Sequence, residues 1–160
     1  MEVTDWMLGV LAMCASASRF LKGKFMLQAP TGELFWMALT AAWTAILFAP
    51  YAVVRIKKIG WGRVMIDPLP GDDPFEKAWA HRAYRAHMNA IETFATFAPV
   101  AIAVSLSGAS TETTVMAAQI YFWSRLIHAP IYIFKVPVLR LLTFMVGLAC
   151  TLILAWALVI

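Results

Sequence analysis

Two short stretches of the sequence repeat one spacing of ionisable side chains. The first is RAYRAHMNAIE, residues 82–92, and the second is RLIHAPIYIFK, residues 125–135. With 3.6 residues per helical turn, the polar members of each stretch fall on one narrow stripe: Arg82, Arg85, Asn89 and Glu92 on the first, and Arg125, His128, Tyr132 and Lys135 on the second. His87 falls on nearly the opposite side, where we expect a neighbouring helix or a lipid headgroup to satisfy it.

The turn SGAS, residues 107–110, joins the two stretches and sets which residues share a height. An antiparallel pair of helices centred on this turn has three level pairs: Glu92 with Arg125, Asn89 with His128, and Arg85 with Tyr132. We expect Glu92 and Arg125 to form an ion pair, because an isolated arginine inside a bilayer costs at least about 2.5–3.5 kcal/mol.

That ion pair alone is explained by a polar clasp that only holds two helices together. Asn89, His128, Tyr132 and Arg140 exceed what such a clasp needs. Because ionisable groups inside a membrane commonly mark functional sites, we expect a polar pocket that opens to the cytoplasm and has lipid at its flank.

The composition places the helices that carry these residues in a membrane. The 160-residue chain is 62% hydrophobic and 14% charged, whereas a soluble domain carries about 25% charged residues. Its net charge of +4 comes from basic residues in loops, and without a compact basic patch we expect no nucleic acid partner. Cys14 and Cys150 lie in apolar segments, which favours buried thiols over a disulfide framework.

Four segments are long enough to cross a bilayer, which takes about 20 apolar residues. Two of them, Leu34–Val54 and Leu141–Ile160, contain no charge. The other two run from about Asp73 to Leu106 and from about Thr113 to Phe134, and we expect Pro50 and Pro99 to introduce kinks. The chain is therefore predicted to be all-α, an integral membrane four-helix bundle of up-down topology over residues 31–160.

The loops predict the orientation of this bundle. Basic residues concentrate between Arg55 and Arg85 and again at Lys135 and Arg140, whereas the turn near Gly108 has none. We therefore expect a multi-pass protein, of the bacterial inner membrane, with these loops and the site facing the cytoplasm and both termini outside.

Residues 1–30 are expected to form an interfacial or re-entrant segment with an extra short apolar helix. The apolar run Trp6–Ser18 is too short for a span; a fifth span is the alternative. The sequence lacks HExxH, GxSxG and P-loop motifs, and its three histidines are poorly arranged for a metal, so no metal site is expected.

In its motifs the chain resembles the MAPEG family, membrane-associated proteins in eicosanoid and glutathione metabolism. RAHMNAIE resembles the family's RAHxNxxE motif, and RLIHAPIY resembles the RxxHxxxY element of the prostaglandin E synthase branch. VPVLR, with Arg140, and VVRIKK, with Arg55, match two further basic elements. The resemblance covers about Leu34 to Ile160.

The resemblance implies a homotrimer that holds glutathione between subunits near the cytoplasmic face. Carried over by position, it makes Arg140 the residue that activates the thiol and Arg85 and Arg125 members of a supporting charge network. It also implies five glutathione contacts: Arg55, Asn89, Glu92, His128 and Tyr132. The implied function is a glutathione-dependent transferase or peroxidase acting on a lipophilic electrophile, with glutathione as co-substrate.

Three positions depart from the family's pattern and support a different reading. Met88 replaces a glutathione-binding arginine, Leu141 replaces a serine and Phe144 stands where a tyrosine is expected. These changes remove polar contacts, so a non-catalytic member that binds a lipid or a protein partner is the second hypothesis. A transporter or proton relay is the third, suggested by the expected Glu92–Arg125 pair.

Overall fold

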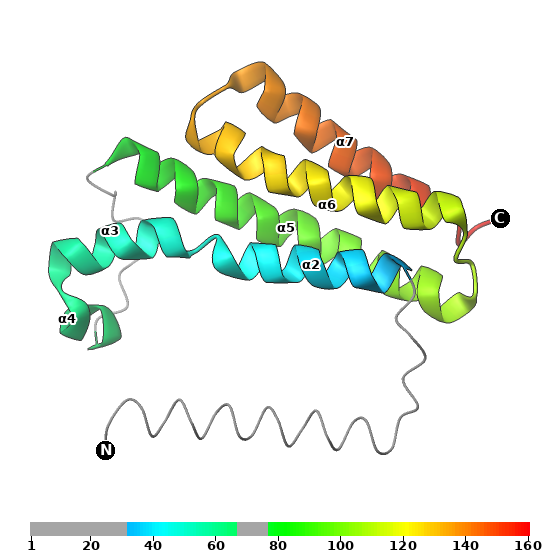
Figure 1. The fold of residues 1–160 in the computed structure, drawn as a ribbon, viewed down its shortest axis with the longest axis horizontal. Coiled ribbons are helices and arrows are strands. Elements are labelled where there is room, and N and C mark those ends of the chain that lie inside the picture. Colours follow the sequence, from blue (N-terminus) through cyan, green and yellow to red (C-terminus); the bar gives the residue numbers. More distant parts are fainter. Residues whose placement is uncertain (1–31, 67–76) are drawn as a thin grey trace, which may run out of the picture. The chain divides into compact units, whose positions relative to one another are not determined.

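The computed structural model describes residues 32–66 and 77–160, which form α-helices and no strand. The helices are α2 Gly32–Ile46, α3 Ala49–Ile59, α4 Trp61–Ile66, α5 Ala78–Ser107, α6 Glu112–Ile133 and α7 Pro137–Trp156 (Figure 1). All of them belong to one compact unit, residues 31–160. The predicted N-terminal segment 1–30, with Cys14, and the predicted helix start at Asp73 lie outside the described residues.

Among the described helices, three segments are long and apolar enough to cross a membrane. They are Gly32–Ile59, which combines α2 and α3, Ala78–Ser107, which is α5, and Pro137–Trp156, which is α7. Helix α6 has a comparable length of 22 residues but is not among these three segments, and it contains Gln119, Arg125 and His128. The predicted all-α fold is confirmed for the described residues, and the three segments support a multi-pass membrane protein. The fourth predicted span, α6, is not among them.

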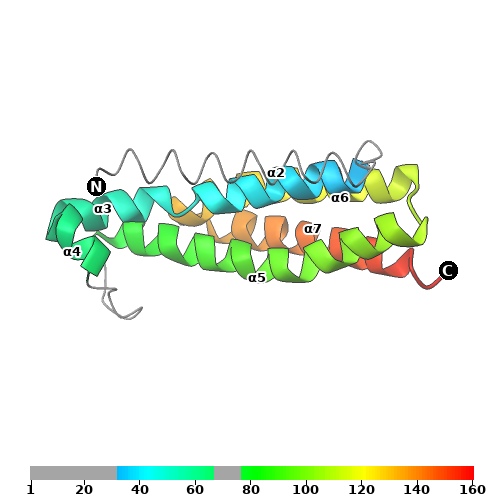
Figure 2. The same cartoon turned by 90° about the horizontal axis from the view of Figure 1, so that it is seen from below.

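Helices α5 and α6 are the two elements against which the other long helices pack. Helix α6 contacts α2, α5 and α7, while α5 also contacts α2, α3 and α7 (Figures 1 and 2). At the centre of this core the rings of Phe97 in α5 and Tyr121 in α6 stack at 3.8 Å between centroids, with Cys150 and Leu154 of α7 in the same cluster. Small residues at the contact face let membrane helices approach closely; the buried alanines of α5 are Ala80, Ala83, Ala86, Ala90 and Ala101.

Proline positions shape the first span more than the second. The helix is interrupted at Leu47 and Phe48, and α3 restarts with Pro50 in its first turn, where the missing N–H costs nothing. The expected disturbance at Pro50 is therefore present as a break between α2 and α3. Pro99, by contrast, lies inside the continuous helix α5.

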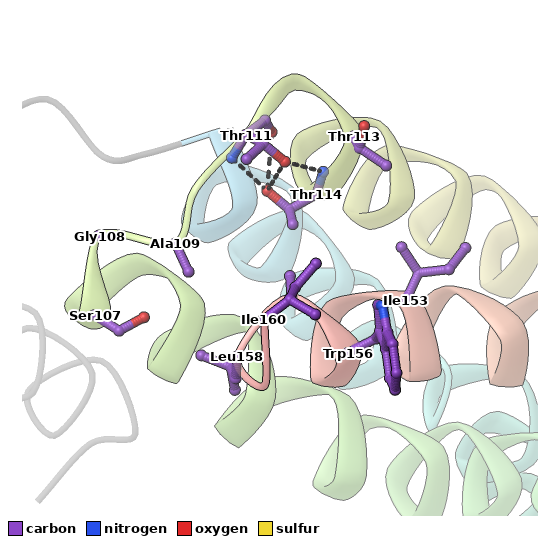
Figure 3. A pocket seen from close by; sticks show the side chains of 11 residues that line it. Ser107, Gly108, Ala109, Thr111, Thr113, Thr114, Ile153, Trp156, Leu158 and Ile160 are labelled. Carbon is purple, nitrogen blue, oxygen red and sulfur yellow. Dashed lines mark hydrogen bonds between the residues drawn. The ribbon is translucent and has the colours of Figure 1, made fainter.

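One end of the helices is tied together around a buried carboxylate that the sequence analysis did not single out. Glu33, fully buried at the start of α2, accepts hydrogen bonds from the Ser110 hydroxyl at 2.8 and 3.0 Å and from the Thr114 hydroxyl. Thr111 and Thr114 form a capping box at the start of α6 (Figure 3). This end contains the turn at Gly108, whose φ of 74° suits glycine.

The opposite end closes through Arg82 and a tight connection from α6 to α7. The Arg82 Nε donates to the carbonyl oxygen of Ile133, the last residue of α6, at 2.6 Å. Lys135 adopts a left-handed φ of 60°, and Pro137 then occupies the first turn of α7. Helix α7 thus begins one turn before the predicted Leu141, because proline fits the first helical position.

Candidate functional site

A cationic cavity of about 540 Å³ lies at the end where α6 passes into α7. Helix α5 contributes His81, Arg82 and Arg85, and the remaining wall comes from Tyr132, Lys135, Val136, Pro137 and Arg140. Four of these side chains are permanently charged cations, and none is a carboxylate. This cavity therefore suits an anionic ligand, for which arginine offers forked donors.

Two of the predicted site residues are in contact at this cavity. The Arg140 guanidinium lies over the Tyr132 ring, with its Cζ 5.0 Å from the ring centroid. Arg85, predicted to lie level with Tyr132, lines the same cavity from α5. Arg140 lies in the first turn of α7 and is exposed, so its charge is available to a ligand.

Arg125 does not form the predicted ion pair with Glu92. It is 3% exposed, and its Nη2 donates to the carbonyl oxygens of Thr143 at 2.7 Å and Phe144 at 3.4 Å. The predicted ion pair was wrong because backbone carbonyl oxygens of α7, rather than a carboxylate, accept the hydrogen bonds of the guanidinium. Gly147 makes this contact possible: a Cβ there would lie 2.8 Å from the Arg125 Cζ.

His128 is buried beside Arg125 and is tied to the same helix. Its Nδ1 is 2.8 Å from the Thr143 hydroxyl, which itself donates to the carbonyl oxygens of Leu139 or Arg140. Because that hydroxyl hydrogen is used within α7, Nδ1 must be the donor in this bond. His128 therefore holds the first turns of α7, which carry Arg140, against α6.

A second cavity, of about 330 Å³, lies further along α5 and α7. Asn89 and Glu92, both predicted site residues, line it together with Thr93, Thr96, Tyr121, Phe144, Gly147, Leu148 and Thr151. Both cavities are bounded by α5 and α7. Among the residues that the structure describes, the buried Asn89 Oδ1 and His128 Nε2 have no hydrogen-bond partner, so the predicted level pair does not bond directly.

Arg55 and His87 lie away from both cavities. Arg55 is half-buried on α3 and lines neither of the cavities described above. His87 lies 2.8 Å, through Nδ1, from the Tyr51 hydroxyl of α3. The expectation that a neighbouring helix satisfies His87 is thus confirmed.

A third cavity, larger than the two described above, is an unsuitable reaction site. It measures about 710 Å³ and lies near the Gly108 turn, between the start of α6 and the end of α7 (Figure 3). Its wall is formed by hydroxyl and apolar groups such as Thr111, Thr114, Ile153 and Trp156, and no lining residue is ionisable. Ionisable side chains do line the two smaller cavities described above.

The comparison with protein families agrees with this arrangement. The model of the MAPEG family matches residues 34–160, most of the chain. The chain belongs to the MAPEG family. No curated protein and no solved structure matches it. The MAPEG family includes glutathione transferases and peroxidases as well as non-catalytic members, so membership admits the first two hypotheses drawn from the sequence.

The sequence motifs do not include two residues that build the site, Thr143 and Gly147, although these position His128 and Arg125. Lys135 was predicted on the polar stripe of the third helix, but it lies in the connection after α6. A glycine in the middle of an uncharged apolar segment was the available signal for a close approach.

Proposed function

We propose that this MAPEG protein is a membrane-bound glutathione transferase or peroxidase that acts on lipophilic electrophiles. The observation that carries the proposal is the cationic cavity with Arg85, Tyr132 and Arg140 in its wall and no carboxylate. Glutathione carries two carboxylates and a thiol, all of which a cluster of guanidinium groups attracts.

Arg140 is proposed to stabilise the thiolate of glutathione. A free thiol has a pKa near 8.5 and is mostly protonated at neutral pH, whereas the thiolate is the nucleophile. A fixed positive charge next to sulfur lowers the pKa of the thiol. In conjugation to an aryl chloride, the thiolate forms the carbon–sulfur bond, and the carbon–chlorine bond breaks as chloride leaves.

The other predicted glutathione contacts differ in how near they lie to the cationic cavity. Tyr132 is held by Arg140 at the cavity, and Asn89 and Glu92 line the neighbouring cavity between α5 and α7, where a carboxylate suits the ammonium group of glutathione. Buried His128 is better suited to positioning α7 than to touching a ligand. Arg55 lies elsewhere on α3, so it can serve this site only from another subunit.

The proposal includes an assembly and an orientation. The family resemblance implies a homotrimer of four-span subunits, in which Arg55 of one subunit reaches the cationic cavity of the next. The basic residues of the α3–α5 region and of the α6–α7 connection favour a cytoplasmic position for this cavity, with both termini on the outer side.

The test is glutathione binding and turnover by the purified protein in neutral detergent. We expect calorimetry to detect glutathione and the protein to conjugate 1-chloro-2,4-dinitrobenzene or reduce a lipid hydroperoxide. Arg140→Ala should lower turnover at pH 7 by about tenfold or more and shift the pH–rate profile to higher pH, since the thiol pKa returns toward about 8.5. Glu112→Gln, at the far end of α6, is the control.

No glutathione binding, together with no turnover of either substrate class, would contradict the proposal. A pH–rate profile that Arg140→Ala leaves in place would contradict the role of Arg140 specifically.

The second candidate is a non-catalytic member of the family that binds a lipid or a protein partner. It is favoured by Met88 and by Leu141, whose side chain is 59% exposed directly after Arg140. By the family resemblance, both stand where relatives carry polar groups that bind glutathione. Lipid that copurifies with the wild-type protein, in a preparation that does not bind glutathione, would favour this function.

A further inference from the structure

A cavity of about 360 Å³ lies where the end of α3 meets the start of α5. We call it the lysine cavity, and it is lined by Val53, Val54, Lys57, Lys58, Lys77 and Trp79. None of the residues proposed to bind glutathione is among them, and none of these lining residues is a carboxylate. The lysine cavity is therefore chemically separate from the proposed reaction site.

Two of its lysines present their charge to the surroundings of the protein. Lys57, in the last turn of α3, and Lys77, at the N-cap of α5, are both exposed. Within residues 32–66 and 77–160, no hydrogen bond or ion pair engages either ammonium group. Helices α3 and α4 add positive charge without compensation, since neither contains an acidic residue. This concentration of positive charge attracts an anion.

The remaining wall of the lysine cavity is apolar. Val53 lies one helical turn before Lys57, on the segment Gly32–Ile59 that is long and apolar enough to cross a membrane. Its side chain is 48% exposed, and that of Trp79, contributed by α5, is 37% exposed. An anion held by the lysines would therefore have exposed hydrocarbon next to it, on the side where the span continues into the bilayer.

The short helix α4, which follows α3 after Gly60, has the composition of a segment at a membrane surface. Its Trp61, Met65 and Ile66 side chains are all exposed, and Arg63 lies between them. Exposed apolar side chains next to basic ones are typical of segments in the headgroup layer, where tryptophan is enriched. We therefore expect α4 and the adjoining lysine cavity to lie at the height of the lipid headgroups.

We propose that the lysine cavity binds an anionic phospholipid of the leaflet at this end of the protein. The headgroup phosphate lies between Lys57 and Lys77, and an acyl chain follows Val53 into the bilayer. Ammonium groups form charge-assisted hydrogen bonds with phosphate oxygens, and the indole N–H of Trp79 is a further donor for phosphate or ester oxygens. The lysine stems can cover apolar surface while their charged ends reach the phosphate.

A phospholipid suits both parts of this cavity, whereas a soluble phosphate suits only one. Exposed ion pairs contribute little by themselves, so two exposed lysines would hold a free phosphate weakly. A lipid adds the apolar contact with Val53 and Trp79, and an anionic leaflet attracts basic residues next to a membrane span. This site goes beyond the proposed glutathione chemistry and does not require it.

The test is a lipid titration of the full-length protein in neutral detergent, read by native mass spectrometry. The probe is palmitoyl-oleoyl phosphatidylglycerol, and the comparison lipid is phosphatidylcholine with the same acyl chains. We expect phosphatidylglycerol to fill one site per chain and to bind at least about tenfold more tightly. Each lysine near an anionic lipid contributes about fivefold, or about 1 kcal/mol. Glycerol phosphate, which lacks the chains, should not displace the lipid at equal concentration.

Variants assign the binding to the lysine cavity. Lys57→Gln and Lys77→Gln should each weaken phosphatidylglycerol binding by about threefold to fivefold, and the double variant by about tenfold or more, with phosphatidylcholine binding unchanged. Arg63→Gln is the matched control, because it removes one positive charge from α4 without touching the cavity. It should change the affinity by less than about twofold, as should Arg140→Ala at the cationic cavity.

The same variants separate this proposal from the proposed function. The double variant Lys57→Gln and Lys77→Gln should lose the preference for phosphatidylglycerol but conjugate glutathione at the wild-type rate in detergent. Arg140→Ala should do the reverse. Failure of one proposal is thus distinguishable from failure of the other.

Four results would overturn the inference. The first is equal affinity of the wild-type protein for the two lipids, a measurement that does not depend on whether any variant folds. The second is an equal loss in Arg63→Gln and Lys77→Gln, which would indicate diffuse attraction by the basic region. The third is a preference that Arg140→Ala abolishes and the double lysine variant retains, which would place the lipid in the cationic cavity. The fourth is displacement by glycerol phosphate at equal concentration, which would make this a site for soluble phosphates.

Discussion

Arg125 illustrates how a buried guanidinium is satisfied without a carboxylate. Its Nη2 reaches the carbonyl oxygens of Thr143 and Phe144, each of which has a second lone pair beyond the one used in its helix. Neighbouring helices and freed backbone groups supply such partners inside membranes. As a result, Glu92 is not consumed by an internal ion pair and stays available to a ligand.

The pairing of Glu92 with Arg125 could not be rejected from the sequence alone. The helix register predicts which residues share a height, but it does not fix how each helix is rotated about its axis or which third helix intervenes. Helix α7 intervenes here, because Gly147 leaves room for the guanidinium. Level residues at the cationic end, Arg85 and Tyr132, do line one cavity.

Gly147→Ala should destabilise the protein, because the added methyl group overlaps the guanidinium of Arg125, whose Cζ would lie 2.8 Å away. Moving the guanidinium breaks its bond to Thr143. We expect a loss of about 1–3 kcal/mol, measured as a lower midpoint of thermal unfolding in detergent. Gly62→Ala is the matched control, since a Cβ at Gly62 meets no atom within 4 Å.

The same overlap predicts a coupling between the two positions. In an Arg125→Met background the guanidinium is absent. Gly147→Ala should then lower the free energy of unfolding by no more than about 0.5 kcal/mol, because the two substitutions are coupled through this one contact. Additive losses in the double variant would show that Gly147 serves some other contact.

At the scale of elements, the sequence placed the helices well and their ends less well. The predicted segment Thr113–Phe134 appears as Glu112–Ile133, and the segment ending near Leu106 appears as α5, ending at Ser107. The segment Leu34–Val54 appears instead as two helices, α2 and α3, and extends to Ile59. Apolar periodicity sets where helices exist, whereas prolines and local caps set where they break and end.

Glu33 was overlooked because it stands at the edge of an apolar segment, where a charge ordinarily faces water. Its burial depends on the hydroxyls of Ser110 and Thr114, 77 and 81 residues later in the chain. A partner at that distance in sequence cannot be assigned from spacing alone. The resulting clasp joins the start of α2 to the start of α6.

Thr114→Val should therefore loosen this end of the helices. The variant removes the hydroxyl that donates to Glu33 and accepts from the Thr111 N–H at 2.8 Å. Loss of these bonds at a residue only 1% exposed should cost about 1–3 kcal/mol in thermal unfolding. Thr113→Val, the exposed neighbour in the same turn, should change stability by less than about 0.5 kcal/mol; equal losses would rule out the clasp.

At the scale of the whole molecule, helices α5 and α7 both line two cavities of opposite charge. The cavity with Arg85 and Arg140 carries cations at the helix ends, and the cavity with Glu92 carries an anion near the middle of the spans. The carboxylates and the ammonium group of one glutathione molecule would thus be attracted to neighbouring cavities of opposite charge. This separation requires the cationic end to face an aqueous compartment.

Whether the cationic end faces a different compartment from the Gly108 turn depends on α6. The Gly108 turn and the Lys135 connection lie on opposite faces of the membrane only if α6 crosses it. We expect this crossing, although α6 is not among the three candidate spans, since its polar groups, Arg125 and His128, are buried against α7. In a variant without cysteines, Ser107→Cys should react with a membrane-impermeant maleimide on intact spheroplasts.

The matching position at the other end should behave oppositely. Phe134→Cys, at a residue 76% exposed, should react only after the membrane is permeabilised, as should Arg63→Cys of α4, the control on the basic side. Labelling of Ser107→Cys and Phe134→Cys from the same side would mean that α6 does not cross. The cationic cavity would then no longer be separated from the Gly108 turn by the bilayer. Labelling of Phe134→Cys on intact spheroplasts would refute the proposed cytoplasmic supply of glutathione.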